Sequence, residues 1–381
     1  MAWRGFWITA LGTACGLAAA LYAAVVVVDP YDTLWLSPPF ERAPVSTNQR
    51  YSYPAIARKA RFDSVVIGTS TSRLLRPAKL DEVLGGNFAN LSLSDGTAYE
   101  QSQILKLFAR HHPDARTAIF GIDIVWCDTR RKYIELTFRP FPPWLYDENA
   151  ANDLAHIFNL PAFEAAGRQI GFLLGWRPGR YAPDGYATFL PPAADYDLAR
   201  ARQKIYGEAG PRRHAPVNPP VTLSEDQRAA WKVPTHALMR EMLAALPERT
   251  RKILVFVPYH HFRQAVPGSR HAAFWRECKR RLTAIAGEFA NTHVLDFMIA
   301  SDITLRDENY WDLLHTTVEV ADRVSELIAE GVRTRCGIEG LMRTLSTKPG
   351  STKPGSTKPG PTLAQADLSN CVRAPSGRPP A

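Results

Sequence analysis

An uncharged apolar stretch near the N-terminus, residues 6–28, restricts how this chain can fold. Its 23 residues would form a helix of about 35 Å, enough to cross the roughly 30 Å hydrocarbon core of a bilayer. A buried helix of a soluble domain would have a polar face, and this stretch has none. A cleaved signal peptide is the other alternative, but its apolar region is usually only about 7–15 residues long. We therefore expect residues 1–28 to form a membrane anchor.

The charges that flank this stretch predict its orientation. Arg4 precedes it, whereas three acidic residues follow it before the next basic residue, Arg42. Positive charge is preferentially retained on the cytoplasmic side of a membrane span. The sequence thus predicts a single-pass protein of the bacterial inner membrane, with its N-terminus in the cytoplasm and its main domain in the periplasm.

The net charge of +9 does not indicate a nucleic-acid-binding protein. From Glu339 onward, six basic residues face two acidic ones, so much of the excess lies near the C-terminus. The other basic residues are scattered, without the basic stripe interleaved with aromatic residues that follows a phosphate backbone. We therefore expect a solvated surface and no nucleic-acid partner.

Beyond the anchor, short apolar runs alternate with amphipathic helical patterns. The runs are residues 64–67, 87–93, 117–124, 252–257 and 294–297, and the helical patterns are residues 98–111, 224–246, 274–289 and 318–332. Apolar strands that alternate with helices predict a parallel sheet covered on both faces. We expect an α/β fold with a doubly wound, flavodoxin-like sheet of five parallel strands.

Three segments interrupt or flank the domain that this alternation places at residues 61–337. Residues 29–60 are rich in proline and are expected to be a connector. Residues 128–223 have no clear period, and such an insertion would be either a lid or binding loop, or an irregular packing subdomain. Residues 338–381 contain Ser-Thr-Lys-Pro-Gly three times in succession. A segment with so little apolar surface is expected to be a disordered tail.

The cysteines and the paired histidines carry no metal-binding signature. The five cysteines are isolated and form no CxxC motif. An oxidising compartment would permit a disulfide such as Cys336–Cys371, but the sequence does not select it. The histidine pairs at 111–112 and 260–261 lack further ligands at metal-binding spacing. We therefore expect no metal and no cofactor, and the second pair could line a pocket after the fourth strand.

A serine follows the first predicted strand. Gly68-Thr69-Ser70 stands where that strand ends, and reactive groups of parallel sheets gather at the carboxyl ends of strands. A glycine permits a sharp turn there, and a serine beyond it could project its hydroxyl near a helix N-terminus, which stabilises negative charge. The alternative is a helix cap, a role open to Ser70, Thr71 or Ser72.

The second motif is Asp312-Leu313-Leu314-His315, between the fifth strand and the last helix. A serine hydroxyl is a weak nucleophile until a base removes its proton. Histidine is the usual base near neutral pH, and a carboxylate orients it and stabilises its charged form. The alternative for this motif is a capping aspartate followed by a surface histidine.

Together the two motifs resemble those of the SGNH, or GDSL-like, hydrolases. In that family the nucleophile lies in a Gly-Asp-Ser block after the first strand, and the base and its partner lie in an Asp-x-x-His block near the end of the domain. The resemblance covers roughly residues 60–335, apart from the insertion. It implies an SGNH-type fold with Ser70 as nucleophile, His315 as base and Asp312 as the group that orients the base.

Two further blocks of the family correspond less closely. The glycine block, whose amide helps to form the oxyanion hole, would fall at residues 90–96, and the resemblance implies the amide of Gly96 or Asp95. The Gly-x-Asn-Asp block reads Gly-Ile-Asp-Ile and lacks the oxyanion-binding asparagine. Since a carboxylate would repel an oxyanion, we expect Asp123 to point elsewhere, for example toward Arg73.

The layout of the whole chain is similar to that of membrane-anchored SGNH-like proteins. Such proteins take part in O-acylation of envelope or exported polysaccharides, including alginate acetylation and lipoteichoic acid alanylation. The resemblance implies a serine esterase or O-acyltransferase that handles acyl groups, above all acetyl, through an acyl-serine intermediate. Polysaccharide and a membrane-bound acyltransferase would be its partners. The alternative is a non-catalytic SGNH-like module that binds or assembles such a complex.

Overall fold

The five apolar runs lie side by side in one sheet of the computed structural model, which describes residues 2–346 and 372–374. They form β1 (Ser64–Ile67), β2 (Phe88–Asn90), β3 (Thr117–Ile122), β4 (Arg251–Phe256) and β5 (Thr292–Asp296). These strands are parallel and have the spatial order 2-1-3-4-5. Nearly all their side chains are buried, which is why the strands show no polar alternation in the sequence. The expected α/β fold with a mostly parallel sheet is confirmed.

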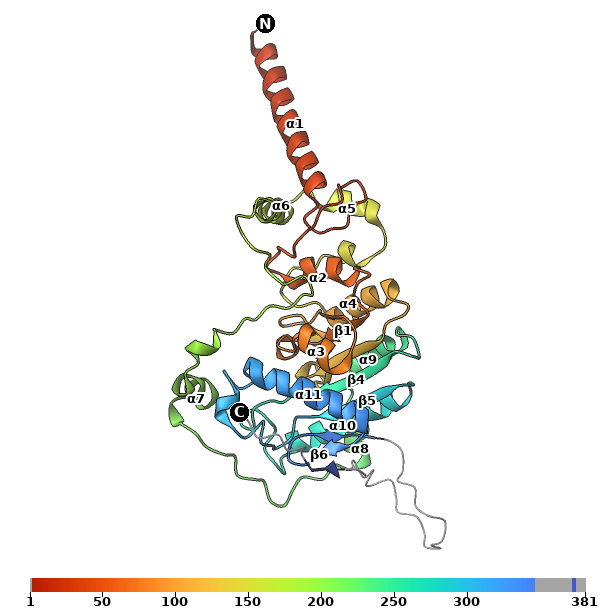
Figure 1. Ribbon diagram of the computed structural model, residues 1–381, viewed down its shortest axis with the longest axis vertical. Helices are drawn as coiled ribbons and strands as arrows, with labels where there is room; N and C mark the ends of the chain where they lie inside the picture. The colour runs from red at the N-terminus through yellow and green to blue at the C-terminus, as the bar shows by residue number, and fades with distance from the viewer. Residues whose placement is uncertain (1, 347–371, 375–381) are drawn as a thin grey trace. The chain divides into compact units, whose positions relative to one another are not determined.

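Helices pack on both faces of this sheet. α3 (Pro77–Leu84) contacts α11 (Val318–Thr334), and their apolar side chains share a core cluster with alternate strand residues. α4 (Ala98–His111) contacts α9 (Thr235–Ala244), which contacts α10 (Arg270–Gly287) (Figure 1). The shorter helices α7 (Leu198–Tyr206) and α8 (Glu225–Ala230) precede α9.

Local sequence explains where α4 begins. The side chain of Thr97 accepts a hydrogen bond from the backbone N–H of Glu100, and the Glu100 carboxylate accepts one from the N–H of Thr97. This reciprocal capping satisfies two N–H groups that the helix itself cannot. The observed helix coincides with the predicted residues 98–111.

The sheet has one strand more than the five expected. β7 (Arg343–Thr344) pairs antiparallel with β5 at an edge of the sheet. It lies inside residues 338–381, which were expected to be a disordered tail, so that boundary needs correction. Ile338 and Met342 give the physical reason, because both side chains are buried in the core cluster beside the sheet. Their apolar surface leaves water only if the chain returns to the domain.

A second sheet of two strands involves the same region. β6 (Gly337–Ile338) pairs in parallel with β8 (Val372–Arg373). Cys336, directly before β6, is disulfide-bonded. Apart from Ser346, the Ser-Thr-Lys-Pro-Gly repeats lie outside the described residues, and so does Cys371 of the suggested Cys336–Cys371 pair.

The chain divides into two compact units, and this division differs from the expected one. The anchor unit is Met1–Lys59 with Arg139–Ala187, and the sheet unit is Ala60–Phe138 with the chain from Thr188 onward. Residues 29–60 therefore belong almost entirely to a folded unit and are more than a connector. The insertion is likewise shared between the two units and is not one separate subdomain.

Two segments far apart in the sequence build the anchor unit. Its helices are α1 (Ala2–Val28), α2 (Gln49–Ala57), α5 (Ala150–His156) and α6 (Leu160–Leu173). Tyr53 of α2 joins the two segments, since its buried ring packs against Tyr181 and its hydroxyl donates to the Gly185 carbonyl at 3.0 Å. Such contacts have no local pattern that a sequence could display.

The expected apolar N-terminal helix is confirmed. α1 is long and apolar enough to cross a membrane, and it is almost entirely exposed. It extends away from the rest of the anchor unit as one continuous helix (Figure 1). Its length and composition therefore agree with the expected membrane span.

A disulfide that the sequence did not indicate links the segment after β3 to α10. Cys127, shortly after β3, is bonded to Cys278 of α10, and their Cα atoms are 5.6 Å apart. The two cysteines are 151 residues apart, so only the fold brings them together. Disulfides persist mainly in oxidising compartments such as the periplasm.

We predict that replacing Cys127 and Cys278 together by alanine lowers the free energy of unfolding by about 2–5 kcal/mol, because the bond closes a long loop of the unfolded chain. Denaturant titration of the full chain in detergent, followed by tryptophan fluorescence, measures this change. Peptide mapping without reductant should recover the two cysteines in one cross-linked fragment. Recovery of both as free thiols from exported protein would contradict the assignment.

Candidate active site

Packing of two glycines against a buried serine shapes the turn that carries Ser70. This residue opens η1 (Ser70–Ser72), a single turn directly beyond β1. A Cβ atom added at Gly68 would lie 2.4 Å from the Ser72 hydroxyl, and one added at Gly121 would lie 1.7 Å from it. Ser72 is fully buried, and its hydroxyl has no hydrogen-bond partner among the described residues. The Ser72 side chain therefore holds the turn against β1 and β3, and Ser70 lies at its free edge.

Ser70, His315 and Asp312 lie in a continuous chain of hydrogen bonds. The Ser70 hydroxyl is 2.9 Å from Nε2 of His315. On the other side of the ring, Nδ1 of His315 is 2.8 Å from Oδ2 and 3.1 Å from Oδ1 of Asp312. The first and last motifs of the sheet unit, 245 residues apart for Ser70 and His315, thus meet at the carboxyl edge of the sheet.

Backbone hydrogen bonds close the loop that carries the aspartate and the histidine. Tyr310 and Thr316 form an isolated antiparallel bridge, and the Trp311 N–H donates to the His315 carbonyl at 2.9 Å. Inside the loop, Oδ1 of Asp312 accepts the backbone N–H groups of Leu314 and His315 at 2.8 and 2.9 Å. Asp312 therefore caps this loop, as the alternative interpretation allowed, and contacts the imidazole as well.

The electrostatics of Asp312 favour the tautomer that a serine nucleophile needs. Burial by itself raises the pKa of the Asp312 carboxyl, but the hydrogen bond and charge of His315, with the two backbone N–H groups, bring it below its ordinary value. The carboxylate is thus ionised near neutral pH and accepts the proton on Nδ1. Nε2 is then free to accept the proton of the Ser70 hydroxyl.

Phe189 is part of the site, and the sequence did not point to it. Its ring lies edge-on to the His315 imidazole, with centroids 5.0 Å apart. The Arg73 guanidinium lies 4.8 Å from the centroid of the same ring and donates to the Ser94 hydroxyl at 2.9 Å. Phe189 comes from the aperiodic residues 128–223, where no pattern distinguishes one aromatic residue from another.

Asp123 takes a different direction from the suggested contact with Arg73. Its carboxylate accepts a hydrogen bond from the Thr69 hydroxyl and another from the Val125 N–H at 2.9 Å. Burial raises the pKa of Asp123 to about 6, against the opposing effect of these hydrogen bonds. The Asp123 carboxylate is therefore occupied beneath the turn of Ser70.

Gly96 has a structural role that weakens its assignment as an oxyanion donor. Its N–H donates to the Leu93 carbonyl at 3.0 Å and so closes a turn. A Cβ atom at this position would lie 2.7 Å from that of Leu93, which explains the glycine. Asp95 before it has a left-handed backbone with φ of 52°. The amide of Gly96 is used within the turn, and the expectation that it binds an oxyanion needs correction.

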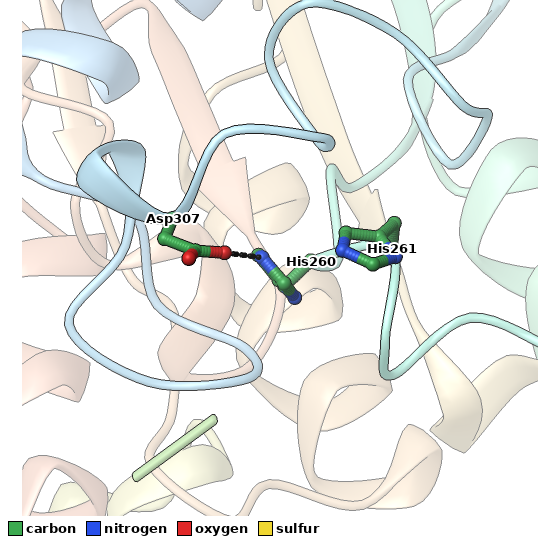
Figure 2. Close-up of side chains that lie close together, drawn as sticks. All are labelled: His260, His261 and Asp307. Atoms are coloured by element: carbon green, nitrogen blue, oxygen red, sulfur yellow. Dashed lines mark hydrogen bonds and ion pairs between the residues drawn. The ribbon is translucent and has the colours of Figure 1, made fainter. Parts of the chain in front are cut away.

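A second polar cluster lies after β4, where the paired histidines were expected to line a pocket. Ligand atoms of His260, His261 and Asp307 lie within 4.8 Å of one another (Figure 2). The spacing of the histidines did not reveal this set, because the fold supplies the carboxylate. Oδ1 of Asp307 also accepts the Tyr206 hydroxyl at 2.7 Å, and Oδ2 accepts Nε of Arg202 at 2.8 Å.

The hydrogen bonds of this cluster leave little capacity for a metal ion. The Phe262 N–H donates to Nδ1 of His260 at 3.2 Å, so the ring proton is on Nε2, which faces Asp307 at 3.2 Å. A protonated nitrogen has no lone pair for a metal. Burial and the neighbouring His261 lower the pKa of His260 to about 4, although Asp307 opposes this shift.

This cluster supports the loop that carries Asp312 and His315. The backbone N–H of His260 donates to the Leu313 carbonyl at 3.2 Å. Tyr310, whose ring packs edge-on to His260, donates its hydroxyl to the Pro258 carbonyl at 2.8 Å. The segment after β4 is therefore a scaffold for the loop after β5.

A small apolar cavity lies beside the two motifs. Its volume is about 20 Å³, close to the room that one water molecule needs. Thr71 and Leu314, the chain neighbours of Ser70 and His315, line it together with core side chains such as Val257.

We predict that Asp123→Asn stabilises the protein above pH 6 by up to about 3 kcal/mol, the free energy that corresponds to the raised pKa. In the wild type, the buried carboxyl stabilises the fold fully below its unfolded pKa near 3.8, and this contribution is lost as pH rises through about 6. Asparagine retains a carbonyl acceptor and does not ionise. Thermal unfolding is measured from pH 4 to 8. The melting temperature of the variant should rise relative to that of the wild type as the pH increases from about 4 to about 6. Parallel curves at all pH values would contradict the prediction.

Comparison with known proteins adds no family to this description. No protein-family model matches the chain, and no curated protein matches its sequence significantly. Function must therefore be inferred from the geometry of the site itself.

Proposed function

We propose that the sheet unit is an SGNH-type serine esterase or O-acyltransferase. One observation carries the proposal. The Ser70 hydroxyl is 2.9 Å from Nε2 of His315, and Nδ1 of the same ring is 2.8 Å from Oδ2 of Asp312. Nucleophile, base and orienting carboxylate in this order are the arrangement that activates a serine for acyl transfer. The strand order and the position of both motifs support the SGNH-type fold.

The bond changes and proton transfers of the proposed reaction involve only these side chains, the acyl donor and an acceptor. The Ser70 oxygen attacks the ester carbonyl carbon while Nε2 of His315 takes its proton. The tetrahedral intermediate collapses, and the leaving alcohol receives that proton. A sugar hydroxyl or water then attacks the acyl-serine, His315 takes its proton, and Ser70 leaves as the alcohol. Transfer and hydrolysis differ only in this acceptor.

We propose acetyl esters as the substrate class. The layout of the chain, with an apolar N-terminal helix before the two motifs, is similar to that of the membrane-anchored SGNH-like proteins that take part in polysaccharide acetylation.

The anchor and the disulfide support a location outside the cytoplasm. α1 supplies an apolar helix of spanning length, and Cys127–Cys278 favours an oxidising compartment. We propose that the sheet unit lies in the periplasm and acts on envelope or exported polysaccharide, with a membrane-bound acyltransferase as its donor partner.

One observation favours the second candidate, a non-catalytic binding module. Asp123 stands where the family has an oxyanion-binding asparagine, and its carboxylate points to Thr69. Loss of one oxyanion donor costs about 2.7–4 kcal/mol of transition-state stabilisation. Such a site would be slow unless a partner supplies the missing donor.

We predict that Ser70→Ala lowers the turnover of an activated acetyl ester by on the order of 10⁴-fold, because the nucleophile is lost. Asp312→Ala should be less damaging than His315→Ala, since the orienting group is partly dispensable. The assay uses the full chain in detergent with 4-nitrophenyl acetate, and a fluorophosphonate probe should label the wild type and not the Ser70→Ala variant.

Ser72→Ala is the matched control for this experiment. It removes a buried hydroxyl that has no hydrogen-bond partner among the described residues, and it keeps the Cβ that packs against Gly68 and Gly121, so activity and folding should be retained. If Ser72→Ala loses activity and Ser70→Ala does not, the nucleophile has been misassigned. Absence of both turnover and labelling in the wild type would favour the binding module.

We also predict that protease added to intact spheroplasts digests the sheet unit, because the charges around α1 favour an orientation with this unit outside. Immunoblotting with an antibody to the sheet unit measures the loss of the full-length band. A cytoplasmic protein serves as the control for intact membranes. Protection of the whole chain until detergent is added would exclude the proposed orientation.

A further inference from the structure

Helix α6 of the anchor unit exposes large apolar side chains along one face. Leu160, Phe163, Gly167, Ile170 and Leu174 recur every three or four residues and therefore share a face. Leu160, Ile170 and Leu174 are 69, 40 and 53% exposed. The opposite face is buried and consists of small residues and Gln169. A helix on a soluble surface would have charged residues on its outer face.

Aromatic residues extend this apolar surface at both ends of α6. Phe158 precedes the helix and Trp176 follows it, and both side chains are more than half exposed. Trp35 and Leu36, shortly after α1, are also at least half exposed. Amphipathic aromatic rings with leucine are typical of the boundary between headgroups and acyl chains.

Direct contacts place α6 at the end of the spanning helix. The Tyr22 hydroxyl of α1 donates to the Leu154 carbonyl at 2.8 Å. The Tyr22 ring packs against Phe158, and Phe158 packs against Phe163 of α6, with centroids 5.7 and 5.4 Å apart. Tyr22 lies in the last turns of α1, which ends at Val28. Figure 1 shows α6 nearly end-on beside this end of α1, so the two helices cross.

Cationic side chains border the apolar face. The side chain of Arg177 lies across α6, since a Cβ atom at Gly171 would be 3.2 Å from it. Arg168 pairs with Glu164 one turn away, at 3.6 Å. Arginine at such a border can extend its guanidinium to lipid phosphates while its methylene groups stay on apolar surface.

We propose that α6 lies in the interfacial layer of the same bilayer that α1 crosses, with its exposed face toward the acyl chains. Lipid is the occupant because the face is continuous, through Tyr22 and Phe158, with the lipid-facing helix α1. With 14 residues α6 is about 21 Å long, too short to span a membrane. An in-plane amphipathic helix is the arrangement that fits this length and pattern. The inference is independent of the chemistry of Ser70.

Depth-dependent fluorescence quenching of the full chain in lipid nanodiscs tests this proposal. Cys15 of α1 is the free cysteine among the described residues, so a bimane label reports the spanning helix in the wild type. In a Cys15→Ser background, the label is moved to Leu160→Cys, Ile170→Cys or Leu174→Cys. Asp226→Cys, exposed in the sheet unit, is the matched control. The quencher is phosphatidylcholine with a nitroxide at acyl carbon 5 or 12.

The three α6 labels should be quenched at least 3-fold more strongly than the Asp226 label, and more by the carbon-5 than by the carbon-12 nitroxide. The Cys15 label should show the reverse depth preference. Quenching at Cys15 with none at α6 would overturn the proposal, and the apolar face would then be an interface for another protein. If the Cys15 label is also unquenched, α1 does not span the bilayer and the proposal fails with it.

Discussion

Burial of the parallel sheet on both faces is the constraint on which the rest of the sheet unit depends. Strands that run in one direction all end at one edge, so every loop that follows a strand begins there. Ser70 follows β1, and the Asp312–His315 loop follows β5. β1 and β5 are nonetheless separated by β3 and β4, a distance of about 14 Å across the sheet.

The loop after β5 therefore has to reach back toward β1 and be held there. Hydrogen bonds from the segment after β4 hold it, through the backbone of His260 and the carbonyl of Pro258. The buried cluster around Asp307 fixes that segment in turn.

Three buried or partly buried carboxyl groups illustrate how position decides protonation. Asp312 and Asp307 accept hydrogen bonds from cationic or ionisable partners, and the pKa of each is lowered although burial alone would raise it. Asp123 has only a hydroxyl and a backbone N–H as donors, and burial prevails. The first arrangement suits a group that orients a base, whereas the second suits a structural contact beneath the turn of Ser70.

Local patterns in the sequence were sufficient for several parts of this protein. The five parallel strands of the main sheet were recognisable because buried apolar runs are continuous, and α4 because its cap and its period are both local. The apolar helix α1 needed only its composition, and the motifs that carry Ser70 and His315 needed only their places relative to the strands. Each of these signals lies within a few consecutive residues.

Only the tertiary structure decided the features that depend on distant residues. Ser70 and Ser72 are equivalent in the sequence, and the difference is that Gly68 and Gly121 enclose Ser72 whereas His315 reaches Ser70. Contacts between distant segments also determine three other features. These are the disulfide of Cys127, the position of Phe189 and the division of residues 128–223 between two units. Contacts between segments far apart in the chain leave no local period, so packing alone determines them.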